Sequence, residues 1–355
     1  MIYKALSGTG LRVSRLCLGT GAFGVAPPAD DIDRLVRGAL DVGVNMFDTA
    51  NSYGNFARMD RPGAPPAADR ESAEQLLGKA LKGRRDEAVI CTKVREVVGP
   101  GINDYGLSRR HIFQQVEKSL RALQTDHIDI YHCHGPDRET SLEQTLRALD
   151  DLVRQGKIRY FALSNYPAWE MTHAIDLCDR LGLNRPVAHQ RGYNLLLRDI
   201  ELDVIPACRH FNVDLTAYFP LAGGLLAGAA TRSRPISGIT RFVIDKSKPV
   251  PVPDEQVKAA DRLDRLAEAW GMKPAHAALA WLFTKPFLAT AIIGPETLAE
   301  LEDSAAAAAI VLDPQQIADL DALCPPAPTW DMLYRTSQPA PLETVMNPRR
   351  EQRLV

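Results

Sequence analysis

Short apolar segments alternate with amphipathic segments along most of this chain. The apolar segments are rich in β-branched residues and have the length of buried parallel strands. There are eight of them, at residues 16–19, 44–48, 88–93, 127–134, 160–164, 186–190, 213–218 and 288–294. Between them, apolar side chains recur three and four residues apart, which predicts helices over residues 72–81, 108–123 and 140–155. Two further apolar segments around a Gly-containing turn predict a hairpin over residues 2–14.

Two folds share this alternation, the (β/α)8 barrel and the doubly wound sheet. The ends of the predicted strands favour the barrel, because active sites of barrels gather where the strands end. Six of the eight strands end in polar or aromatic side chains, namely Asp48, Lys93, His134, Ser164 with Asn165, Gln190 and Tyr218. We therefore expect an α/β protein with a (β/α)8 TIM barrel over residues 1–323. It would carry an amino-terminal hairpin, a long loop after the seventh barrel strand (223–253) and a Pro-rich carboxyl-terminal tail (324–355).

The composition points to a small-molecule ligand. The 355 residues include 42 Lys and Arg and 44 Asp and Glu, which gives a net charge of −2 without a long block of one sign. This balance does not favour nucleic acid or a membrane surface as a partner. No segment approaches the ~18 apolar residues of a membrane span, and the first residues lack the pattern of a secretory signal. We therefore expect a cytoplasmic protein, and the six scattered cysteines predict no disulfide framework.

Four side chains near the ends of three successive strands suggest the chemistry of carbonyl reduction. Reduction of a carbonyl by hydride transfer needs a proton for the developing alkoxide, and the hydroxyl of Tyr53 could provide it. A buried Lys93 beside the phenol would favour the phenolate, and Asp48 would balance the lysine charge. His134 could donate to the substrate oxygen or relay a proton. Each residue alone also has a structural explanation, such as an ion pair or a core histidine, but their shared position favours the catalytic one.

Two other motifs have simpler interpretations. Residues 19–24 match Gly-x-Gly-x-x-Gly, but Val-Ala-Pro-Pro follows where a dinucleotide-binding fold would begin a helix. We interpret the segment as a loop that lies close to a ligand, with Gly21 in contact with it. His132 and His134 share one face of their strand, but Cys133 points to the other side and no third ligand has suitable spacing, so we predict no metal site.

Several motifs resemble those of the aldo-keto reductase superfamily over roughly residues 2–323. They are Asp48-Thr49-Ala50-Asn51-Ser52-Tyr53, Thr92-Lys93, Ile128 to His134, Gly156 to Tyr160, Ser164-Asn165, Gln190 with Tyr193-Asn194, and Ala217 to Gly224. The resemblance implies a barrel that binds an extended nicotinamide cofactor, with Tyr53 as general acid and Asp48, Lys93 and His134 in support. It also implies that Ser164, Asn165 and Gln190 hold the carboxamide and that Tyr218 stacks on the nicotinamide ring.

The rest of the cofactor site follows from the same resemblance. After the stacking Tyr218, the segment with Phe219, Leu221 and Gly223 would approach the pyrophosphate, although relatives commonly have Ser where this chain has Phe219. Near the last strand, the residues expected around the adenosine are Gly294, Glu296, Glu300, Asp303 and Ser304. The resemblance implies NADP(H), with NAD(H) as the alternative, since a carboxylate at Glu296 would repel a 2′-phosphate. Basic residues in the 223–253 loop could compensate; they are Arg232, Arg234, Arg241, Lys246 and Lys248.

These observations lead to one functional hypothesis and two alternatives. We expect an enzyme that reduces an aldehyde or ketone of a small metabolite, such as a sugar, to an alcohol. The alternatives are a cofactor-binding regulatory module with slow turnover, and a redox-neutral epimerase or lyase that uses transient oxidation. A Pro/Ala-rich loop at residues 55–70 is expected to form part of the pocket, where Arg58, Arg61 and Arg70 could meet a polar substrate.

Overall fold

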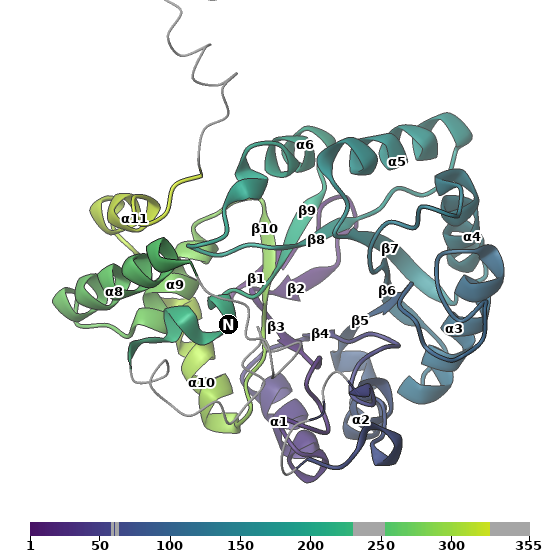
Figure 1. Cartoon of the computed structure of the whole chain (residues 1–355), viewed down its shortest axis with the longest axis horizontal. Helices are drawn as coiled ribbons and strands as arrows, with labels where there is room; N and C mark the ends of the chain where they lie inside the picture. The colour runs from purple at the N-terminus through teal and green to yellow at the C-terminus, as the bar shows by residue number, and fades with distance from the viewer. Residues whose placement is uncertain (58–59, 61–63, 230–252, 327–355) are drawn as a thin grey trace, which may run out of the picture.

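Eight parallel strands close into a barrel in the computed structural model, which describes residues 1–57, 60, 64–229 and 253–326 (Figure 1). Their order around the barrel follows the sequence, with the last strand beside the first. The strands are β3 (Leu16–Gly19), β4 (Met46–Asp48), β5 (Val89–Val94), β6 (Ile128–Cys133), β7 (Ile158–Ser164), β8 (Ala188–Gly192), β9 (Asp214–Tyr218) and β10 (Leu288–Ile293). All eight overlap the predicted apolar segments, so the barrel prediction is confirmed and the open sheet is excluded.

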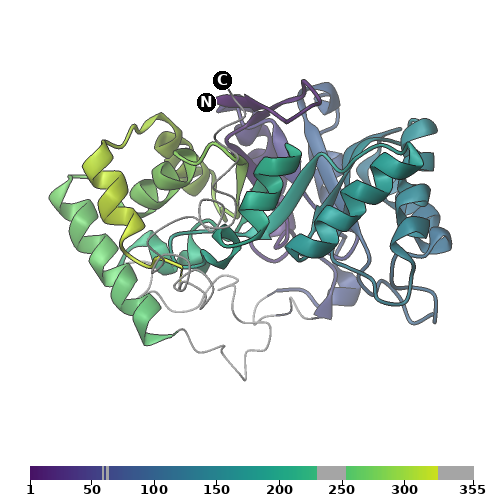
Figure 2. The ribbon, with the colours of Figure 1, turned by 90° about the horizontal axis from the view of Figure 1, so that it is seen from above.

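Helices surround the barrel and bury their apolar faces against it (Figures 1 and 2). The predicted helices are present as α2 (Ala73–Ala80), α3 (Arg109–Leu123) and α4 (Leu142–Arg154). The others are α1 (Ala29–Asp41), α5 (Ala168–Leu181), α6 (Val204–Phe211), α8 (Asp254–Ala269), α9 (Pro274–Phe283), α10 (Leu298–Ala306) and α11 (Pro314–Asp321). Short 3-10 helices occur at η2 (Ala67–Asp69), η3 (Arg85–Glu87), η4 (Asp199–Glu201), η5 (Ala222–Ala227) and η6 (Ala307–Ala309).

The predicted hairpin closes one end of the barrel. Strands β1 (Tyr3–Ala5) and β2 (Arg12–Ser14) pair antiparallel, and Figure 2 shows them at one end of the molecule. Leu6 and Val13 are buried there against the first residues of the barrel strands. Lys4 anchors the hairpin through an ion pair of 2.5 Å with Asp214 at the start of β9. With the amino ends of the strands covered, a ligand has access from their carboxyl ends.

Parts of three predicted segments lie outside the described residues. They are residues 58–59 and 61–63 of the Pro/Ala-rich loop, most of the basic loop, residues 230–252, and most of the tail, residues 327–355. Within the described ranges, no helix combines the length and the apolar character that crossing a bilayer requires.

Candidate active site

The carboxyl ends of β4, β5 and β6 bring together the residues that the sequence indicated. Asp48 ends β4, Lys93 is the penultimate residue of β5, and His134 directly follows β6. In the strand register, Asp48 lies beside Cys91 and Lys93 lies beside His132. Lys93 and His134 are each two positions beyond these register partners, and the three side chains come from the carboxyl ends of neighbouring strands.

Tyr53 reaches the same place because the loop after β4 continues along β5. The amide of Thr49 donates to the carbonyl of Cys91 at 2.8 Å, and that of Asn51 donates to the carbonyl of Lys93 at 3.3 Å. Directly after Tyr53 the chain turns at Gly54, which has a φ of +90°. A Cβ atom at this glycine would lie 2.6 Å from the backbone nitrogen of Ala73, so only glycine allows the close approach to the start of α2.

Lys93 and Asp48 form a buried ion pair under Tyr53. The Lys93 ammonium lies 2.5 Å from Asp48 Oδ1 and donates to the carbonyl of Thr49 at 2.7 Å. Burial of Lys93 disfavours the charged ammonium, but the charges of Asp48 and of an ionised Tyr53 outweigh that effect and raise the pKa of Lys93. Its Nζ is 4.9 Å from the centre of the Tyr53 ring. A permanent positive charge therefore lies next to the phenol.

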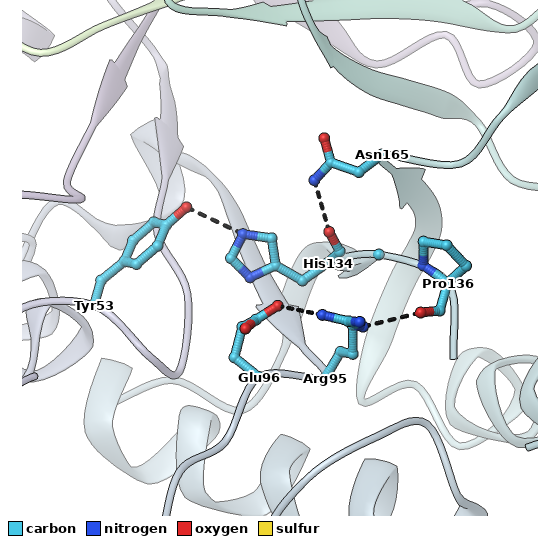
Figure 3. Close-up of a pocket in the computed structure, with 7 residues that line it drawn as sticks. Tyr53, Arg95, Glu96, His134, Pro136 and Asn165 are labelled. Carbon is cyan, nitrogen blue, oxygen red and sulfur yellow. Dashed lines mark hydrogen bonds and ion pairs between the residues drawn. The ribbon is translucent and has the colours of Figure 1, made fainter. Parts of the chain in front are cut away.

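His134 completes the group from the other side of the phenol. Its Nε2 lies 3.3 Å from the hydroxyl oxygen of Tyr53, and the two rings meet edge to face with centres 5.7 Å apart (Figure 3). His132, two residues earlier, is fully buried and contacts Ser164 Oγ through Nδ1 at 3.3 Å. Burial and the neighbouring charges of Lys93 and His134 lower the pKa of His132, so it stays neutral. Across the described ranges no three His, Cys, Asp or Glu side chains are grouped around one metal position.

Asn165 and Tyr218 are fixed at the ends of β7 and β9. Asn165 donates through Nδ2 to the carbonyl of His134 at 2.8 Å, and its Oδ1 accepts from the Tyr218 hydroxyl at 2.9 Å. Phe219 follows with its ring edge toward Tyr218, the ring centres being 5.1 Å apart. Asn165 and Phe219 have φ values of 63° and 56°, a left-handed conformation that is rare outside glycine and that clusters at functional sites.

These residues fit a flat ring that carries an amide. Gln190 donates through Nε2 to Asp48 Oδ2 at 2.7 Å, which leaves its Oε1 without a donor among the described residues. That oxygen can accept from a carboxamide N–H, and the partly exposed Tyr218 offers an aromatic face. Two segments that the sequence predicted to contact the cofactor contain glycines. Gly21 is close enough to the phenol that an added Cβ would contact the Tyr53 ring at 3.9 Å. Leu221 and Gly223 lie in the turn at η5, where Gly223 has a φ of 67°.

The five residues predicted to contact the adenosine differ in the contacts that they make within the protein. Gly294 and Glu296 lie in the loop between β10 and α10, and the Glu296 amide donates to Glu300 Oε2 at 2.8 Å. Ser304 donates to the Glu300 carbonyl within α10. Asp303 forms an ion pair with Lys273 at 2.5 Å, and its Oδ1 lies 3.1 Å from His276 Nε2. The Glu296 carboxylate, in contrast, has no ion pair with a described residue.

The glycine motif at residues 19–24 does not form a dinucleotide-binding turn. The first helix begins only at Ala29, beyond Pro27 and Pro28, so no helix starts within these glycines. This agrees with the interpretation of the motif as a loop at the barrel mouth.

The suggested role of Arg70 as a substrate contact was wrong. Its side chain is 2% exposed and donates to the carbonyls of Gly54, Phe56 and Pro65 and to Asp60. Arg70 therefore holds the loop after Tyr53 in place, because backbone oxygens occupy its donors. Arg58 and Arg61 lie outside the described residues.

A cavity of about 360 Å³ opens at this site, and four of its seven lining residues were missed in the sequence. Tyr53, His134 and Asn165 line it as expected. The others are Arg95, Glu96, Gly135 and Pro136, which follow β5 and β6 (Figure 3). The sequence contains one signal for Arg95 and Glu96. They are charged residues two and three positions after Lys93, at the end of a predicted strand.

Comparisons with known proteins agree with this geometry. Residues 15–324 match the sequence model described as Aldo/keto reductase family. The chain is 36% identical over 332 residues to the "Uncharacterized oxidoreductase YrpG" of Bacillus subtilis (strain 168), covering 92% of this chain and 96% of that protein. It is 30% identical over 319 residues to a "Probable voltage-gated potassium channel subunit beta" of Arabidopsis thaliana, covering 88% and 92%. It is also 30% identical over 354 residues to the "Versiconal hemiacetal acetate reductase" of Aspergillus parasiticus, covering 90% and 96%.

Proposed function

The chain belongs to the aldo/keto reductase family, and from this premise we propose that it reduces the carbonyl group of a small polar aldehyde or ketone, with Tyr53 as the general acid. It is accordingly an oxidoreductase, and the family uses nicotinamide cofactors. The observation that carries the proposal is the position of the Tyr53 hydroxyl, which has His134 Nε2 at 3.3 Å and the Lys93 ammonium beneath its ring.

The bound cofactor would supply the hydride to the carbonyl carbon. As negative charge develops on the carbonyl oxygen, the Tyr53 hydroxyl donates its proton to that oxygen. The charge of Lys93 stabilises the phenolate that remains, and Asp48 keeps the ammonium in place. His134 Nε2 shares the hydrogen-bonding region of the Tyr53 hydroxyl, so it can orient the carbonyl oxygen or return the proton.

The nicotinamide end would be held by Gln190, Asn165 and Tyr218. Hydrogen bonds within the protein keep these three side chains in place. At the adenosine end, residues 294–297 carry the carboxylate of Glu296 and no basic side chain. Binding of NADP(H) would therefore depend on a cation from elsewhere, whereas the 2′-hydroxyl of NAD(H) could donate to Glu296.

A second function deserves a test because some relatives are named as potassium channel subunits. A regulatory module of that kind would bind the cofactor and oxidise it slowly. A measurement with the reduced cofactor and aldehyde in excess over the protein separates the two. An enzyme exchanges its oxidised cofactor and continues at a steady rate, whereas a slow module oxidises about one equivalent and then proceeds only slowly.

The proposal is tested by mixing the purified protein with NADPH or NADH and a set of small aldehydes, and following loss of the reduced cofactor. Tyr53→Phe should abolish reduction while leaving cofactor affinity nearly unchanged, because the hydroxyl transfers a proton and does not hold the cofactor. Tyr160→Phe is the matched control, since that hydroxyl contacts the carbonyl of Thr9 in the amino-terminal hairpin. Full activity of Tyr53→Phe would exclude the proposed role.

A further inference from the structure

One wall of the candidate active site is a pair of adjacent charged residues that the mechanism above does not use. Arg95 and Glu96 follow β5 and line the same cavity as Tyr53 and His134 (Figure 3). Arg95 Nη1 donates to Glu96 Oε1 at 2.8 Å. The two side chains are 26% and 28% exposed, so a ligand in the cavity can reach them.

The Arg95 side chain is held in one orientation by contacts on several sides. Its Nε donates to the carbonyl of Pro136 at 3.0 Å, and its guanidinium carbon lies 5.3 Å from the centre of the Tyr105 ring. It also packs flat on Gly135, where an added Cβ would lie 3.5 Å from Arg95 Cδ and Nε. Arg95 is thus ordered before a ligand binds. Binding then does not include the entropy cost of ordering a long side chain, which favours recognition.

The backbone of Arg95 supports the same conclusion. Its φ is +139°, in the region that residues with a Cβ rarely adopt. Such strain persists only where the surroundings impose it, and it concentrates at functional sites. Here the Arg95 carbonyl accepts from the amide of Gly106 at 2.8 Å, which fixes the turn that directs the side chain toward the cavity.

The pair leaves both donors and acceptors available. A guanidinium has five N–H donors, and among the described residues Arg95 uses Nε for Pro136 and Nη1 for Glu96. Nη2 therefore remains free of described partners. On Glu96, Oε1 accepts from Arg95, and Oε2 accepts no hydrogen bond from the described residues.

This chemistry selects among substrate classes. A carboxylate or phosphate would be attracted to Arg95 but would face the Glu96 carboxylate beside it. An apolar group would cover two charged side chains without replacing their hydrogen bonds to water, which costs free energy. A neutral group with several hydroxyls meets neither cost, since each hydroxyl can accept from Arg95 and donate to Glu96.

We infer that the Arg95 and Glu96 pair recognises the hydroxyl groups of a polyhydroxylated aldehyde or ketone while its carbonyl lies at Tyr53. The inference rests on the proposed reductase function and narrows its substrate to sugar-like compounds. Arg95 donates to a hydroxyl oxygen near the carbonyl, and Glu96 accepts from the same or the next hydroxyl. The cavity of about 360 Å³ has room for a small polyhydroxylated aldehyde or ketone.

The test compares three small aldehydes in steady-state kinetics: glyceraldehyde, propanal with the same carbon chain but no other hydroxyl, and succinic semialdehyde with a carboxylate. The wild-type protein should prefer glyceraldehyde. In Arg95→Met, kcat/KM for glyceraldehyde should fall roughly 10- to 100-fold, the loss expected for a hydrogen bond to a charged group. Propanal reduction should change less than about threefold, because it makes no such bond.

Two further variants sharpen the comparison. Glu96→Gln should lower kcat/KM for glyceraldehyde and raise it for succinic semialdehyde, because the repelling charge is gone. Arg138→Met is the matched control, since Arg138 also forms an ion pair, with Glu170 at 2.9 Å, and lies 5.8 Å from the Trp169 ring but does not line the cavity. It should leave all three substrates unchanged.

The outcomes separate this inference from the function on which it rests. If the wild type reduces propanal as well as glyceraldehyde, or if Arg95→Met weakens all three substrates equally, the pair has no recognition role and the reductase function stands. A wild-type preference for succinic semialdehyde would also overturn the inference, in favour of an anionic substrate. Reduction of none of the three with either cofactor would contradict the proposed function and this inference together.

Discussion

Gln190 Nε2 donates a hydrogen bond of 2.7 Å to Asp48 Oδ2, while Asp48 Oδ1 pairs with Lys93 at 2.5 Å. One buried carboxylate therefore connects the residue expected to hold the cofactor's amide with the lysine beneath Tyr53. A substitution of Gln190 should therefore alter the position of Lys93, and the reverse, because Asp48 has only these partners among the described side chains to fix its orientation.

Replacing Gln190 tests this connection. Gln190→Met keeps the approximate size but removes both the donor to Asp48 and the acceptor for the amide. Cofactor affinity should fall up to about tenfold, since a neutral hydrogen bond contributes about 0.5–1.5 kcal/mol, and kcat should fall because the bond to the charged Asp48 is lost. Fluorescence titration with the cofactor and steady-state kinetics provide the two measurements. Gln316→Met is the control, because that glutamine caps α11 outside the site. Unchanged affinity and kcat in Gln190→Met would show that the 2.7 Å contact has no part in function.

Loss of the Lys93 charge should reduce both activity and stability. Lys93→Met leaves Asp48 buried with an uncompensated charge, and breaking a buried pair in this way costs about 3–5 kcal/mol. It also removes the positive charge next to the phenol, so carbonyl reduction should be lost. Urea denaturation measures the first effect and aldehyde reduction the second. Lys4→Met breaks another ion pair, with Asp214, and should lower stability while activity is retained. A fully active, fully stable Lys93→Met protein would contradict the proposed network.

The sequence predicted most of the barrel because each strand is a compact apolar segment whose burial does not depend on its neighbours in detail. Asp48, Lys93 and His134 could be grouped from the sequence because strand ends in a barrel meet at one rim. The contact between Gln190 and Asp48 joins residues 142 positions apart, and nothing local indicates which of several polar strand ends will meet.

The roles of loop residues were harder to predict from the sequence for a related reason. Arg70 was assigned to the substrate because it follows the general acid, but its donors are used by three carbonyl groups whose positions depend on the loop's own path. Arg95 was missed because a positive φ directs it back over Gly135, and a single sequence does not reveal a strained backbone angle. Local periodicity determines strands and helices, whereas loop direction depends on contacts made after folding.

Buried histidines should make stability depend on pH below neutrality. Neither ring nitrogen of His189 has a hydrogen-bond partner among the described residues, and burial followed by the charge of Arg191 lowers the pKa of His189 to about 3. In the unfolded chain a histidine has a pKa of about 6.5, so below that pH the unfolded state binds more protons and stability falls as pH decreases. From pH 7 to 5 the loss should be about 2 kcal/mol for this residue.

His189→Leu should remove that loss, so the difference in unfolding free energy between pH 7 and pH 5 should be about 2 kcal/mol smaller than in the wild type. His132, whose pKa is also lowered by burial, should keep part of the dependence in the variant. His173→Leu, at an exposed position on α5, serves as the control. An identical pH dependence in the wild type and His189→Leu would mean that His189 is hydrated or charged in the folded protein.

We expect cofactor preference to depend on Glu296, the carboxylate in the loop between β10 and α10 that has no ion pair with a described residue. If it lies at the adenosine ribose, it accepts from the 2′-hydroxyl of NADH and repels the 2′-phosphate of NADPH. Glu296→Lys should then shift the ratio of affinities toward NADPH by about tenfold or more, because NADH loses the acceptor for its 2′-hydroxyl whereas NADPH exchanges a repulsion for an attraction. Titration of each protein with both cofactors gives the ratio. Glu302→Lys introduces the same charge change at an exposed position on α10, so it measures the general effect of charge on that helix. Equal shifts in the two variants would place Glu296 away from the ribose, and the choice of cofactor would then have to be made by another part of the chain.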